Sequence, residues 1–98
     1  MTRNEHLLTI LAEECAEVAQ RVSKALRFGI NDVQAGQELP NRERLRAEFA
    51  DLLGAAGMLN EAGLLPWPES HDVIAKKQRI AVYLEYSKTQ GTFTEVPE

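Results

Sequence analysis

The chain has 98 residues, the size of one domain, and its 44% hydrophobic but only 6% aromatic content favours helices over a sheet. A net charge of −4 disfavours a general nucleic-acid-binding protein, which would normally carry a basic face, so no nucleic-acid partner is expected. Cys15 is the single cysteine and cannot form an internal disulfide, which favours a reducing, cytoplasmic location. No long apolar run follows the first residues, so neither a signal peptide nor a membrane span is expected.

The first third of the chain predicts one long helix over about residues 4–28. Thr2 or Asn4 can cap its start, and Gly29 is placed to end it. Its apolar side chains form a broad stripe, and the Cys15 thiol lies in this pattern, so we expect it to be buried. The principal members of the stripe are Leu7, Leu11, Val18, Val22 and Ala25.

Two further helices follow a loop. Residues 29–40 contain two glycines and a proline without clear periodicity, which predicts a loop. A second helix is expected to begin at Asn41 as its N-cap and to end at Gly63. After a linker with two prolines, a third helix begins at Ser70 and fades near Ser87. The expected core face of the second helix comprises Leu45, Phe49, Leu52, Ala56 and Leu59.

These elements predict an all-α fold, with three main helices forming a helical bundle. Residues 1–88 are expected to form a single all-α domain, and residues 89–98 an extended or flexible tail. A chain this short buries only about 60–65% of its unfolded surface, so a core shared with a second copy would help it. Homo-oligomerisation is therefore expected to complete the bundle.

Two pairs of carboxylates lie at helical spacing. Glu14 and Glu17 are three residues apart, as are Glu48 and Asp51, so each pair projects from one side of its helix. Both pairs border an apolar face, and Glu13 points further out. Four acids brought together in this way repel one another unless something positive lies between them. Oxygen ligands suit a hard divalent cation such as magnesium or manganese.

Other interpretations of the acids are open or disfavoured. A single pair of this kind more often belongs to a solvated charged face. A di-iron bundle needs Glu-x-x-His pairs, and none is present. A zinc site is disfavoured because Cys15 stands alone and the two histidines, His6 and His71, are isolated near helix starts. The spacing alone therefore places a divalent-cation site somewhat ahead of a solvated face.

Basic residues complete this pattern. Lys24 continues the line of Glu17 along the first helix, and Arg27 ends that helix. Lys76, Lys77 and Arg79 cluster on the third helix. Each alone is typical of a solvated surface, but together with the acids they suit a metal–polyphosphate complex, in which the acids hold the ion and bases neutralise phosphate.

The acidic motifs also carry a family resemblance. Glu13-Glu14-x-x-Glu17, followed by Glu48-x-x-Asp51, resembles the signature of the MazG-like, all-α nucleoside triphosphate pyrophosphohydrolases. Thirty residues separate the two motifs, which is at or beyond the long end of the spacing usual in that family.

Further phrases extend the resemblance over about residues 7–86. Residues 23–29 (Ser-Lys-Ala-Leu-Arg-Phe-Gly) and 41–45 (Asn-Arg-Glu-Arg-Leu) are similar to short phage and bacterial members of the family. The pair Lys76-x-x-Arg79 resembles the basic pair on the family's later helix.

The resemblance implies a Mg²⁺-dependent enzyme, with Mn²⁺ as an alternative ion, that assembles as a homodimer or homotetramer. Its substrate would be a nucleoside triphosphate, hydrolysed between the α and β phosphates to a monophosphate and pyrophosphate. The implied metal ligands are Glu14, Glu17, Glu48 and Asp51. The implied catalytic residues, which orient the attacking water or take its proton, are Glu13 and Glu17. The implied phosphate-binding residues are Lys24, Arg27, Lys76 and Arg79.

A second class of function remains open on the same residues. The broad apolar stripe of the first helix also suits a non-enzymatic helical dimerisation module, or a regulatory module that binds nucleotides without hydrolysing them.

Overall fold

The computed structural model describes residues 1–96 and contains three helices: α1 (Arg3–Phe28), α2 (Asn41–Glu61) and α3 (Ser70–Thr89). No strand is present in this described range, so the all-α prediction is confirmed. The chain divides into two compact units, Met1–Pro66 and a second unit that begins at Trp67. The first unit holds α1 and α2, and the second holds α3. The expectation of a single domain over residues 1–88 stays a prediction.

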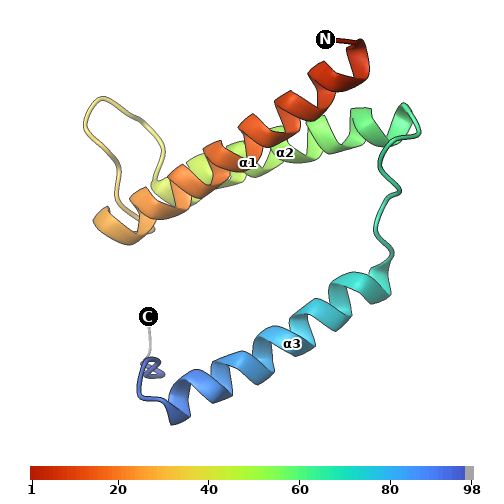
Figure 1. Ribbon diagram of the computed structural model, residues 1–98. Helices are drawn as coiled ribbons and strands as arrows, with labels where there is room; N and C mark the ends of the chain where they lie inside the picture. The colour runs from red at the N-terminus through yellow and green to blue at the C-terminus, as the bar shows by residue number, and fades with distance from the viewer. Residues whose placement is uncertain (97–98) are drawn as a thin grey trace. The chain divides into compact units, whose positions relative to one another are not determined.

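In the first unit, α1 and α2 lie side by side and run in opposite directions (Figure 1). The start of α1 is capped by Thr2, whose Oγ1 accepts a hydrogen bond from the Glu5 N–H at 3.1 Å. Gly29 ends the helix with a φ of 105°, a conformation that favours glycine. Both of these helix boundaries agree with the sequence prediction.

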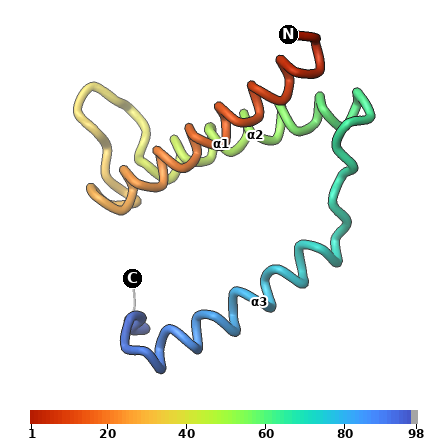
Figure 2. Tube along the Cα trace, viewed as in Figure 1, coloured from red at the N-terminus to blue at the C-terminus, as the bar shows by residue number. Residues whose placement is uncertain are grey.

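The loop over residues 29–40 leaves the end of α1 and returns to the same end of the hairpin (Figure 2). Asn41 was expected to cap α2, but the cap position is Pro40 and Asn41 is the first helical residue. Its side chain reaches back across the loop, and its Nδ2 donates to the Gly29 carbonyl at 2.8 Å. The Arg42 N–H donates to the Ile30 carbonyl at 2.9 Å, so the base of the loop is closed by hydrogen bonds.

The packing of α1 against α2 follows a heptad pattern. Side chains of α1 that are buried or half-buried recur at steps of four and three residues, and α2 repeats the pattern. On α1 the residues that follow this spacing are Leu7, Leu11, Glu14, Val18, Arg21 and Ala25. On α2 they are Asn41, Leu45, Glu48, Leu52, Ala55 and Leu59. We call these twelve residues the seam.

The seam corrects two predictions about which faces are buried. Val22 and Phe49 were assigned to the core, but both are exposed, because each lies one helical position beyond a seam residue. The Cys15 thiol was expected to be buried and is exposed for the same reason. The buried apolar core of the described residues comprises Leu7, Ala55 and Leu59.

The second unit consists of α3 and the segment that follows it. The Glu69 N–H donates to Asp72 Oδ2 at 2.8 Å, which holds the first turn of the helix. Beyond α3, the Thr92 N–H donates to the Ser87 carbonyl at 3.0 Å, and Lys88 Nζ lies 3.4 Å from Glu95 Oε2. Thr92 and Glu95 of the expected tail thus contact the end of α3, and Pro97 and Glu98 lie outside the described residues.

Candidate functional site

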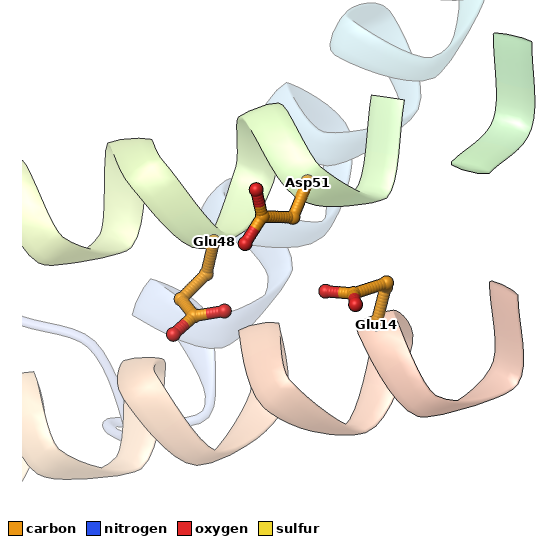
Figure 3. A group of neighbouring side chains, drawn as sticks. All are labelled: Glu14, Glu48 and Asp51. Atoms are coloured by element: carbon orange, nitrogen blue, oxygen red, sulfur yellow. The ribbon is translucent and has the colours of Figure 1, made fainter. Parts of the chain in front are cut away.

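Three carboxylates from the two helices of the hairpin meet at one point of the seam. Oxygen atoms of Glu14 on α1 and of Glu48 and Asp51 on α2 all lie within 4.8 Å of one another. Figure 3 shows the three side chains directed into the space between the helices. Residues more than thirty positions apart in the sequence therefore share one site.

The three acids differ in exposure because of their positions on the helices. Glu14 and Glu48 occupy seam positions and are half-buried, whereas Asp51 is one turn further along α2 and is exposed. The sequence placed Glu14 and Glu48 at the margin of the apolar faces. The structure instead places them in the contact between the helices, where apolar residues precede and follow them.

The environment of Glu14 disfavours its negative charge. Burial, followed by the negative charges of Asp51 and Glu48, raises the pKa of the Glu14 carboxyl above its ordinary value. Glu17 and Glu13 raise this pKa further. A positive ion among these carboxylates would offset the repulsion that raises it.

The donor set fits a hard divalent cation. Mg²⁺ takes oxygen ligands at about 2.1 Å, so two ligands on opposite sides of the ion lie roughly 4 Å apart. One oxygen of each carboxylate lies within 4.8 Å of the others, which is close to that spacing. With three acids and no histidine or cysteine, the group suits Mg²⁺ or Mn²⁺ better than zinc.

Glu17 and Glu13, the remaining acids of the first motif, lie outside this group of three. Both are exposed on α1, and Glu17 is one turn from Glu14. The negative charge of Glu17 contributes to the raised pKa of Glu14, so Glu17 lies near the site although it is not one of the three clustered carboxylates. Their roles as a metal ligand and as groups that handle the water stay predictions.

The basic residues expected to bind phosphate are divided between the two units. Lys24 is half-buried toward the loop end of α1, and the guanidinium of the exposed Arg27 lies 4.8 Å from the centre of the Phe28 ring. Lys76 and Arg79 belong to α3, where Arg79 helps to line a shallow depression of that helix. Phosphate binding by all four stays a prediction.

Two polar seam residues are buried, and the sequence did not predict that burial. Arg21 is only 8% exposed, and Asn41 is 1% exposed. Arg21 Nε and Nη1 and Asn41 Oδ1 are buried and have no hydrogen-bond partner among the described residues. The heptad spacing of these positions was the available signal, because it places a charged residue where an apolar one is normal.

Comparisons with known proteins give no match: no family model, no curated protein and no solved structure is significantly similar to this chain. The MazG-like resemblance therefore rests on the motifs alone. Within residues 1–96, none of the helices combines the length and the apolar character that a membrane crossing requires.

Proposed function

We propose that the chain is a Mg²⁺-dependent nucleoside triphosphate pyrophosphohydrolase that cleaves the α–β phosphoanhydride and releases a nucleoside monophosphate and pyrophosphate. The observation that carries the proposal is the meeting of Glu14, Glu48 and Asp51, from two distant motifs, within 4.8 Å. The resemblance of those motifs to the MazG-like signature supports the choice of substrate.

The carboxylates would hold the ion, with Glu17 one turn away as a further ligand. A bound Mg²⁺ would neutralise charge on the phosphate oxygens and would lower the pKa of a water that it coordinates. In the hydrolysis itself, a water oxygen would bond to phosphorus while the bond from phosphorus to the bridging oxygen breaks. Glu13 or Glu17 orients the water or accepts its proton. Lys24 and Arg27 stabilise phosphate charge from the loop end, and Lys76 and Arg79 are further candidates for that role.

The test is pyrophosphate release from a panel of nucleoside triphosphates, with Mg²⁺ or with EDTA. Glu48→Gln removes a negative charge from the site and is expected to lower kcat/KM at least about a hundredfold, because positioning and charge stabilisation supply most of the rate. Glu61→Gln, on the exposed end of the same helix, is the matched control and should retain wild-type activity.

Circular dichroism should show the same helicity for both variants. Activity that persists in EDTA, or equal activity of the two variants, would contradict the proposal. The metal site contacts the phosphates, which all nucleoside triphosphates share. The panel is therefore needed to identify the preferred base and sugar.

A non-enzymatic dimerisation or nucleotide-binding module is the second candidate. It is favoured by the large apolar side chains that the hairpin leaves at least 40% exposed. Examples are Leu8, Leu26, Phe49 and Leu53. This surface equally supports a homodimeric or homotetrameric enzyme. The single cysteine, Cys15, supports a cytoplasmic setting for it. Light scattering measures the assembly, and an unchanged melting temperature on addition of Mg²⁺ would favour the module over the enzyme.

A further inference from the structure

The seam contains a buried positive charge that the proposed reaction has not used. Arg21 is 8% exposed, and its Nε and Nη1 have no hydrogen-bond partner in the part of the chain that the structure describes. A guanidinium buried in this state is costly unless an anion satisfies it. The residue thus requires an explanation independent of the carboxylates.

Arg21 lies on the same side of α1 as Glu14. The two residues are seven positions apart, which is two helical turns and an angular offset of only about 20°. The separation along the helix axis is roughly 10 Å. Long side chains on a helix generally lean toward its N-terminus, which for Arg21 is the direction of Glu14.

Two contacts fix what faces Arg21 on α2. Glu14 meets Glu48, and the Asn41 side chain bonds to the Gly29 carbonyl at 2.8 Å. The helices run in opposite directions (Figure 1), so the meeting of Glu14 with Glu48 implies that Arg21, seven residues later on α1, is level with the stretch of α2 between Asn41 and Glu48. The seam is therefore negative at Glu14 and Glu48 and positive immediately beyond them, toward the loop.

An internal ion pair is the simplest alternative partner for this charge. Glu17 precedes Arg21 by four residues, a spacing that favours pairing on a helix, yet Arg21 Nε and Nη1 remain unpaired. Glu17 is instead exposed to solvent. A bare cation would not satisfy the guanidinium either, because the two repel each other. The arrangement suits a ligand that is positive at one end and negative at the other.

We propose that Arg21 binds a phosphate oxygen of a cation-bound polyphosphate, so that the seam takes the metal together with its anion in preference to the metal alone. This inference rests on the proposed function and specifies the ligand of the same site. It assigns to Arg21 the anion and to Glu14, Glu48 and Asp51 the cation.

The test measures two affinities in the full chain, for Mn²⁺ alone and for inorganic pyrophosphate in saturating Mg²⁺. Arg21→Met keeps the length of the side chain and removes its charge. Pyrophosphate binding should weaken at least about tenfold, as expected for the loss of a charged hydrogen bond. Affinity for Mn²⁺ alone should stay the same or increase, because a nearby positive charge has been removed.

Weaker pyrophosphate binding without any loss of Mn²⁺ affinity separates a binding role from a structural role, which would weaken both together. Parallel losses in Arg21→Met, or unchanged pyrophosphate affinity, would overturn the inference. Arg21→Lys should bind pyrophosphate with intermediate affinity, since it keeps the charge but loses the planar fork. If Arg21→Met does not fold, the pyrophosphate affinity of Arg21→Lys tests the inference in its place. Arg46→Met, at a side chain 83% exposed on α2, is the control and should change neither affinity.

Failure of this inference and failure of the proposed function give different results. If wild-type protein hydrolyses a triphosphate while Arg21→Met binds pyrophosphate normally, only the role of Arg21 is wrong. If wild-type protein binds neither Mn²⁺ nor Mg²⁺–pyrophosphate and releases no pyrophosphate, both proposals are wrong.

Discussion

The two ends of the α1–α2 seam follow the same heptad spacing but have opposite chemistry. At the end that holds the start of α1 and the end of α2, apolar residues such as Leu7, Ala55 and Leu59 are buried. At the loop end, the heptad positions equivalent to Leu7 and Ala55 carry Glu14, Arg21, Asn41 and Glu48 instead, while apolar residues continue at the other positions. Apolar burial stabilises a hairpin, whereas partly buried charges oppose it. We infer that the first end maintains the fold and that the second is retained for binding.

The sharpest test of the apolar end is Leu59→Ala. Leu59 is fully buried, so its truncation removes apolar burial and leaves a cavity, which should lower the free energy of unfolding by about 2–5 kcal/mol. Leu26→Ala is the control, at a side chain 83% exposed, and should change the stability by less than about 0.5 kcal/mol. Urea denaturation measures both. Equal effects would remove the basis for the comparison.

A smaller effect is expected at the loop end for Asn41→Ala. The substitution leaves the Gly29 carbonyl without the hydrogen bond at 2.8 Å and should cost about 1–3 kcal/mol. Asn60→Ala is a matched control, because Asn60 Nδ2 also donates to a carbonyl, that of Leu65 at 2.9 Å, but in an exposed position. The same denaturation experiment compares them. A larger loss for Asn60→Ala would show that burial does not set the strength of these bonds.

The smallest effect concerns the charge of Glu14, which solvent partly screens. Its pKa is raised in the folded state, so between the ordinary value of 4.5 and the raised value the folded chain binds more protons than the unfolded chain. The contribution of Glu14 to stability therefore falls as the pH rises through this window. In EDTA, the melting temperature of Glu14→Gln should exceed that of wild type increasingly from acidic to neutral pH. A difference independent of pH would contradict this assignment.

Local signals in the sequence were sufficient to locate the three helices, but not both ends of α2, which has Pro40 as its N-cap and ends at Glu61 before the expected Gly63. Thr2 and Gly29 mark the ends of α1, and prolines in the linker separate α2 from α3. These signals act over a few residues, where capping and backbone preferences decide the outcome. The acids at Glu14, Glu48 and Asp51 could also be selected by spacing, because helical periodicity determines which side chains share a face.

The packing register of α1 against α2 could not be predicted from such local signals. Apolar character suggested Val22 and Phe49 for the contact between the helices, yet Arg21 and Glu48 occupy it. Which stripe faces a neighbour depends on how two helices fit together over their whole length, not on the hydrophobicity of single residues. Asn41 shows the same limit, because a residue typical of a helix cap bonds instead to a carbonyl on the other side of the loop.

The hydrogen bonds at the base of the loop fix the register of α2 against α1. A heptad pattern repeats every seven residues, so a shift of α2 by seven residues would preserve the spacing of the seam. Such a shift would move Glu48 to the level now held by Ala55 or Asn41. The Asn41 bond to Gly29 and the Arg42 bond to Ile30 allow only one alignment. An insertion in the loop between Ile30 and Asn41 should leave the three carboxylates close together. An insertion inside either helix should separate the carboxylates of α1 from those of α2.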